Sequence, residues 1–291
     1  MFTIALLTAF FALLVASWTD LRTREVPDWL NYGLIAAGVG LNVLASIVFH
    51  SWWPILYSAA GLGFFVGLGY VLFYAGQWGG GDSKLLMGMG ALFGVEFTLV
   101  KPFVQLETQF LVAFLINLLL VGVMYALSYS MILAVKHRRT VLPAFTKQME
   151  RMGMMRYVII VLTTGLLGLA FIPSLPFVRV SIFLLATLLF TTFYLFAFIK
   201  AVEKTCMYKW VLPSVLTEGD WIARDVIVDK KRICGPKDLG IEKKQIAELE
   251  KLYSQNKIRK VFIKEGIPFV PSFFLGFLVT VYWGNLFLLL L

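Results

Sequence analysis

Long apolar runs recur along almost the whole chain and are separated by short polar stretches. Each run is about 16 to 26 residues long, and a helix of that length can cross the roughly 30 Å hydrocarbon core of a membrane. The pattern predicts an all-α polytopic membrane protein with about eight transmembrane helices. The predicted spans are Phe2–Trp18, Leu30–Phe49, Pro54–Tyr74, Leu85–Val100, Phe110–Val135, Tyr157–Leu175, Ser181–Ile199 and Pro268–Leu290.

Lys and Arg are concentrated in alternate loops between these runs. One set of loops holds Arg22, Arg24, Lys84, six basic residues within 136–156 and fifteen within 200–264, and the other set holds Lys101 and Arg179. Because cytoplasmic loops favour Lys and Arg, we expect a multi-pass protein of the cell membrane with its N-terminus outside. The N-terminus lacks the features of a cleaved secretory signal, so we expect the first span to be retained.

The composition supports this interpretation. The chain is 59% hydrophobic with a mean hydropathy of +0.83, whereas ordinary soluble domains are about 45–50% apolar, which argues against a large soluble helical protein. Cytoplasmic loops that face anionic lipid account for the net charge of +9, so the expected partner is the bilayer and not a nucleic acid.

One segment, 201–265, carries most of the charge and has a mixed pattern. Trp221–Val228 alternates weakly like a strand, Ile241–Tyr253 has helical spacing of its apolar residues, and Lys260–Lys264 resembles another short strand. We expect a small cytoplasmic α+β subdomain here. It follows a membrane domain, 1–200, with seven spans and precedes a last transmembrane helix within 266–291.

Two carboxylates stand at the ends of apolar runs. Asp20 ends the first run, and Asp82 follows the glycine triplet Gly79, Gly80 and Gly81 before the fourth run. The charge asymmetry places both at the cytoplasmic edge of the membrane. Carboxylates at such positions are costly and mark candidate functional sites.

An aspartate pair suits hydrolysis of a peptide bond. Two close carboxylates share one proton near neutrality, so one can take a proton from water while the other polarises the scissile carbonyl. A glycine-rich strand without side chains would let a substrate backbone lie close beside it. The predicted activity needs neither a metal nor another cofactor.

Other interpretations of these residues stay open. Asp82 could serve only as the N-cap of the fourth helix, and Asp20 could be a solvated loop acid paired with Arg22 or Arg24. Intramembrane carboxylates beside a broken helix also occur in transporters and channels. A non-catalytic assembly subunit that binds precursors is a third possibility.

The remaining candidate residues suggest structural roles. Cys206 and Cys234 match neither a metal-ligand spacing nor a disulfide framework, so we expect two free thiols. Trp29 and Trp78 are expected in the aromatic belt at the cytoplasmic interface, although Trp78 is near the glycine triplet.

Three separated motifs resemble the type IV prepilin peptidases, particularly the archaeal branch that includes preflagellin (archaellin) peptidases, within the GxGD intramembrane aspartyl proteases. A segment of the soluble part is also similar. The motifs are Asp20-Leu21-Arg22 with Val26-Pro27-Asp28, Gly79-Gly80-Gly81-Asp82 with Lys84, and Gly266-Ile267-Pro268-Phe269-Val270-Pro271; the soluble segment is Glu218-Gly219-Asp220-Trp221.

The resemblance implies that Asp20 and Asp82 are the catalytic pair and that Gly79–Gly81 and Lys84 form the adjoining loop that contacts substrate. It implies substrates that are prepilin-like or preflagellin-like precursors, cut on the cytoplasmic side after a short basic leader. The acids of the soluble segment are candidates for attracting that leader: Glu203, Glu218, Asp220, Asp225 and Asp229.

Two departures from the family pattern matter. The paired Cys-x-x-Cys motifs of bacterial members are missing from the sequence, so we predict no methyltransferase activity. Eight predicted spans exceed the six expected of a compact archaeal member, and the extra pair lies within 157–199.

Overall fold

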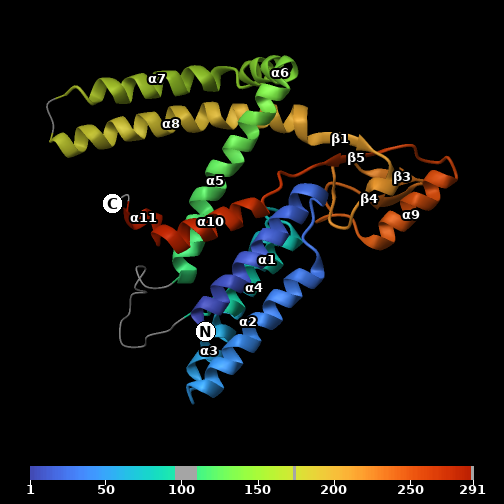
Figure 1. Cartoon of the computed structure of the whole chain (residues 1–291). Coiled ribbons are helices and arrows are strands. Elements are labelled where there is room, and N and C mark those ends of the chain that lie inside the picture. The colour runs from blue at the N-terminus through green and yellow to red at the C-terminus, as the bar shows by residue number, and fades with distance from the viewer. Residues whose placement is uncertain (96–109, 173–174, 290–291) are drawn as a thin grey trace.

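A computed structural model describes residues 1–95, 110–172 and 175–289 (Figure 1). It is mainly helical, with small sheets near the C-terminal end of the chain. The helices are α1 (Phe2–Thr23), α2 (Asp28–Val48), α3 (Trp53–Tyr74), α4 (Gly80–Phe93), α5 (Phe110–Lys136), α6 (Arg138–Arg151), α7 (Met154–Leu169), α8 (Pro176–Val202), α9 (Lys243–Ser254), α10 (Val270–Trp283) and α11 (Leu286–Leu289). The strands are β1 (Tyr208–Val211), β2 (Trp221–Ile222), β3 (Val226–Val228), β4 (Lys231–Cys234) and β5 (Val261–Lys264).

A central bundle is formed by α1, α2, α3, α4, α5 and α10. Within it, α4 packs against both α2 and α3, and α10 packs against both α1 and α5. Large apolar side chains from five of these helices are fully buried in one core: Leu13, Phe65, Leu86, Phe114 and Phe273. The last helix of the bundle therefore closes against the first, although about 250 residues separate them in sequence.

Glycines allow α4 to approach its neighbours closely. A Cβ at Gly38 of α2 would lie 2.6 Å from the backbone nitrogen of Leu92 on α4. The Asn42 side chain, one turn further along α2, donates to the carbonyls of Ala91 and Leu92 at 3.1 Å each. Small residues with interhelical hydrogen bonds are the usual means of packing helices within membranes.

A buried amide joins α5 to the C-terminal helices. Asn117 donates to Thr280 Oγ1 at 2.9 Å and to the Gly284 carbonyl at 2.6 Å, and its oxygen accepts from the Leu286 backbone N–H at 3.0 Å. Each buried polar atom of this side chain is thus paired, as an apolar environment requires. The network fixes α10 beside α5.

The helices differ in number and length from the eight predicted spans. Five of the described helices are long and apolar enough to cross a membrane, and a sixth is obtained if α6 and α7, which meet at an 82° bend, are taken together. The predicted fourth and last spans are short helices here, since α4 and α10 have 14 residues each. Part of the predicted span Leu85–Val100 lies outside the described residues.

The predicted extra spans form a hairpin outside the bundle. Helices α7 and α8 pack against each other, and Figure 1 shows them extending together away from the bundle across the end of α5. Many of their large apolar side chains are exposed, as expected for lipid-facing helices. Helix α6, which packs on α8, occupies a stretch that we had predicted as a loop.

The soluble segment contains two small sheets beside α9. A three-stranded sheet has the order β1-β5-β2 and a two-stranded sheet pairs β3 with β4, all antiparallel. The predicted helix and the strand near 260–264 are confirmed, whereas the predicted strand Trp221–Val228 is wrong because it divides into β2 and β3 on different sheets. Ile222, Ile241, Leu249 and Val261 are buried in a core of their own.

The glycine packing predicts opposite effects at two positions of α2. Gly38→Ala should lower the melting temperature in detergent, with a cost of about 1–3 kcal/mol, because the new methyl group meets the α4 backbone. Gly40→Ala is the matched control: nothing lies within 4 Å of its Cβ position, and alanine is the better helix former by about 1 kcal/mol. Equal melting temperatures for the two variants would contradict this packing.

Candidate active site

Asp20 is held at the junction of the first and last helices of the bundle. It lies near the C-terminal end of α1, is 6% exposed, and its Oδ2 accepts a hydrogen bond from the Val270 backbone N–H at 2.9 Å. Ser17, one turn earlier, donates to the Val270 carbonyl at 3.4 Å. The Asp20 carboxylate therefore caps the N-terminus of α10, where free N–H groups and the helix dipole favour a negative charge.

Asp82 lies in the first turn of α4. Gly79 is the N-cap of this helix, and its backbone N–H donates to Asp82 Oδ2 at 3.3 Å. The alternative that Asp82 is itself the N-cap is therefore wrong. Both candidate aspartates interact with helix N-termini, Asp82 with that of its own helix and Asp20 with that of α10.

The structure brings the two aspartates to the same end of the bundle. The ends of the helices meet there: a Cβ at Gly81 would lie 3.3 Å from Cβ of Val26, in the connection between α1 and α2. Asp20 is buried within a helix and forms no ion pair among the described residues. The alternative of a solvated loop acid is therefore wrong for this residue.

The glycine triplet differs from the predicted open strand. Gly79 is extended, but Gly80 and Gly81 already belong to the first turn of α4. The small size of Gly81 allows the close approach to Val26, and Gly80 faces the ring of Phe73. These glycines let the end of α4 pack tightly against its neighbours.

Lys84 lies one turn into α4 on the side facing α2. Its Nζ is 2.5 Å from Asp28 Oδ1 and 5.3 Å from the ring centre of Tyr32. The lysine is thus already paired with an acid of the first motif. Its ion pair links the two sequence motifs that contain the candidate aspartates.

Trp78 is partly buried and packs against the start of α10, while its place in an interfacial belt stays a prediction. Its ring centre lies 5.9 Å from that of Phe269 and 5.3 Å from that of Phe273. Trp29, predicted for the same belt, is 68% exposed. Trp78 immediately precedes Gly79. The loop that leads to Asp82 therefore packs on α10, the helix whose N-terminus binds the Asp20 carboxylate.

Further residues near Asp20 were not predicted from sequence. Arg24 donates from Nη1 to the Gly266 carbonyl at 2.7 Å and from Nη2 to the Tyr129 hydroxyl at 3.3 Å. Tyr125 lies one turn before Tyr129 on α5, and the two ring centres are 6.3 Å apart. The sequence did contain a signal for these tyrosines. They are four residues apart in an apolar run, and that spacing places two polar hydroxyl groups on one face of the helix.

The comparisons with known proteins agree with the motifs. Residues 7–133 match the type IV leader peptidase family. The matched region contains both candidate aspartates and, beyond the part that the sequence motifs covered, most of α5. The predicted resemblance is therefore confirmed.

Similar proteins come from archaea. A stretch of 89 residues, 31% of the chain, is 36% identical to the preflagellin peptidase of Methanococcus voltae, and a stretch of 80 residues, 28% of the chain, is 38% identical to that of Methanocaldococcus jannaschii. These matches span 38% and 34% of the two relatives. The prepilin peptidase EppA of Methanothermobacter thermautotrophicus is 23% identical over 99% of this chain and 97% of its own length.

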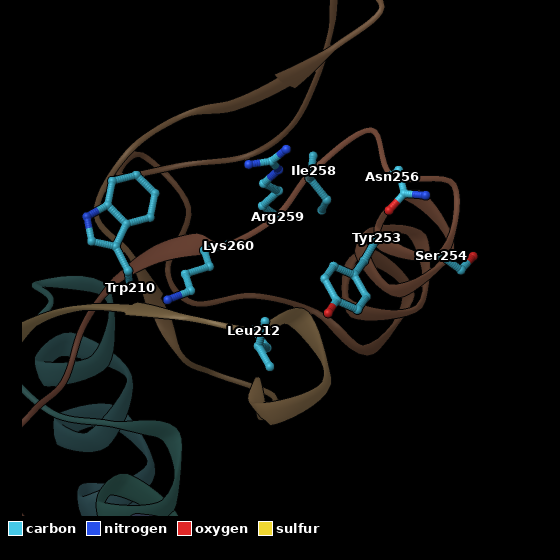
Figure 2. A pocket seen from close by; sticks show the side chains of 8 residues that line it. All are labelled: Trp210, Leu212, Tyr253, Ser254, Asn256, Ile258, Arg259 and Lys260. Atoms are coloured by element: carbon cyan, nitrogen blue, oxygen red, sulfur yellow. The ribbon is translucent and has the colours of Figure 1, made fainter.

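The described residues contain no group of three or more His, Cys, Asp or Glu side chains placed to hold a metal ion. Figure 2 shows a shallow groove of about 720 Å³ in the soluble segment. It is basic and aromatic, contains no carboxylate side chain, and is lined by Trp210, Leu212, Tyr253, Ser254, Asn256, Ile258, Arg259 and Lys260.

Replacing Trp78 should impair the site. Trp78→Ala should destabilise the protein by about 2 kcal/mol, because the aromatic contacts with Phe269 and Phe273 are lost. Trp29→Ala, the matched control on the exposed side of α2, should leave the melting temperature in detergent unchanged. A larger effect at position 29 than at position 78 would contradict the assignment.

The two free thiols should differ in reactivity. Burial raises the pKa of the Cys234 thiol to about 11, and the nearby charge of Asp238 acts in the same direction. Since the thiolate is the reactive form, N-ethylmaleimide at neutral pH should modify the partly exposed Cys206 well before Cys234. Mass spectrometry of the folded protein measures both rates, and faster modification of Cys234 would refute the prediction.

Proposed function

We propose that this protein is a membrane aspartyl endopeptidase that removes the leader from prepilin-like or preflagellin-like precursors. The observation that carries the proposal is the position of Asp20 and Asp82 at the same end of the helix bundle, within a region that matches leader peptidases. The preflagellin and prepilin peptidases among its relatives supply the substrate class.

The proposed chemistry uses the two carboxylates as one unit. One aspartate, ionised, takes a proton from a water molecule as that water attacks the scissile carbonyl. The other, protonated, donates a hydrogen bond to the carbonyl oxygen, where negative charge develops in the tetrahedral intermediate. Helix N-termini at both aspartates support the ionised form without a metal ion.

We place the cut on the cytoplasmic side of the membrane. This orientation follows from the distribution of Lys and Arg over the loops. It puts the soluble segment on the same side as the aspartates, and the N-terminus outside.

The acids of the soluble segment are poor candidates for binding a basic leader. Four of the five predicted ones are already paired with lysine or arginine, at 2.6–3.1 Å. They are Glu203, Glu218, Asp225 and Asp229. Recognition of the precursor therefore depends mainly on its apolar helix and on the backbone near the cut.

Substituting either aspartate tests the proposal. Asp20→Asn and Asp82→Asn should each reduce cleavage of a purified precursor by about 10³-fold or more, because each removes one member of an acid–base pair. N-terminal sequencing identifies the product, and the melting temperature in detergent shows that the variant is folded.

Asp229→Asn is the matched control for these variants. Asp229 has a positive φ of 50° in a turn of the soluble segment, a conformation that asparagine tolerates well. The cleavage activity of the Asp229→Asn variant should equal that of the unaltered protein. Chelators should not reduce the activity of the unaltered protein. Full activity in either aspartate variant would exclude the mechanism. If the unaltered protein binds precursors without cleaving them, an assembly subunit is favoured. If it conducts ions in liposomes without peptidase activity, a transporter is favoured.

A further inference from the structure

The soluble segment touches the loop that leads to Asp82. The ring of Trp221, on β2, lies over Gly76 in the connection between α3 and α4: a Cβ at position 76 would be 3.0 Å from Cη2 of the indole. Gly76 has a φ of +65°, a conformation that glycine adopts without strain. Residues 77–81 then lead directly from this contact to Asp82.

The neighbouring strand leads to Asp20. Trp221 is paired with Lys264 and Ile222 with Ile263 across β2 and β5. From Lys264, residues 265–269 lead to Val270, whose N–H donates to Asp20. The Arg24 hydrogen bond to Gly266 attaches this connection to the end of α1.

The α3–α4 connection and the β5–α10 connection also contact each other. Trp78, in the stretch after Gly76, packs on Phe269, in the stretch before Val270. The contacts therefore form a closed frame, with the β2–β5 pair at one end and the two aspartates at the other.

Hydrogen bonds within the soluble segment stabilise the backbone around β2. The Asp220 side chain accepts from the Thr217 N–H at 2.8 Å, and the Ile241 N–H donates to the Asp220 carbonyl at 2.9 Å. On the other side, the Ala223 N–H donates to the Phe262 carbonyl at 2.8 Å. These hydrogen bonds hold the backbone on both sides of Trp221, whose side chain is 37% exposed.

We propose that the soluble segment is a clamp that sets the separation of Asp20 and Asp82, with Trp221 as a positioning residue. The β2–β5 pair holds the α3–α4 connection through the contact of Trp221 with Gly76. It holds the β5–α10 connection because β5 continues directly into it. Trp221 acts through its contact with the loop at Gly76. The kinetic part of this inference rests on the proposed function, whereas the structural part does not.

The experiment measures geometry and turnover on the same variants. Spin labels at Thr23 and Gln77, both exposed, report the ends of α1 and of the loop before Asp82, in a Cys206→Ser, Cys234→Ala background. Double electron–electron resonance should give a narrow distance distribution for the parent. Trp221→Ala should shift or broaden it, and kcat for precursor cleavage should fall at least about tenfold, since small misplacements of reacting groups are costly.

The KM for the precursor should change by less than about twofold, because the substrate contacts are kept. Compared with Trp221→Ala, Trp221→Phe should bring both the distance distribution and kcat part of the way back to those of the parent. Trp210→Ala is the matched control, since Trp210 is an exposed tryptophan on β1 of the same sheet and lines the groove in Figure 2. It should change neither readout.

The outcomes separate the two proposals. A folded Trp221→Ala variant with unchanged distances and unchanged kcat overturns the clamp. If the parent cleaves no precursor but its distances respond to Trp221→Ala, the proposed function fails and the clamp stands. Should Trp221→Ala not yield folded protein, Trp221→Phe and Trp221→Leu carry the test, and an unaltered distance distribution in both overturns it.

Discussion

The hydrogen bond from the Val270 N–H to Asp20 is the constraint on which the arrangement of the bundle depends. A carboxylate inside an apolar helix bundle is costly unless fixed donors replace water. In this protein the donor is the first turn of α10, so the last helix of the bundle must return to the end of the first. Ser17, Arg24 and the buried contact of Phe273 act at the same junction.

The second aspartate imposes a different requirement, close packing around a short helix. Helix α4 has only 14 residues and is buried along most of its length between α2 and α3. Gly38 and Gly81 allow backbones to approach, and α4 ends at Gly94, whose φ is +67°. A short helix ends inside the protein only where neighbouring groups satisfy its free carbonyls. Here Ser58 Oγ donates to the Ala91 carbonyl at 2.6 Å, and the Asn42 amide donates to the Leu92 carbonyl at 3.1 Å.

The sequence predicted the features that depend on local pattern and on charge. Apolar runs located the helices from α1 to α3 to within a few residues at their starts, and the placement of Arg and Lys predicted that Asp20 and Asp82 share one end of the bundle. Contacts between distant segments had no local signal, so the packing of Trp78 on Phe269 and the pairing of β1 with β5 were missed. The strand at Trp221–Val228 failed because alternation alone cannot show that a chain changes sheet between β2 and β3.

The six-helix bundle explains why two additional helices leave the site intact. Helices α7 and α8 pack on each other and reach the bundle chiefly through α5 and α6, so they contribute no described contact to either aspartate. Helix α8 then delivers the chain to β1, and β5 returns it to α10. In chain order the soluble segment follows the added hairpin and precedes α10, whose N-terminus binds Asp20. The strand that continues from α8, β1, pairs with β5, the strand that leads into α10, so the hairpin and the site are connected through this one strand pair.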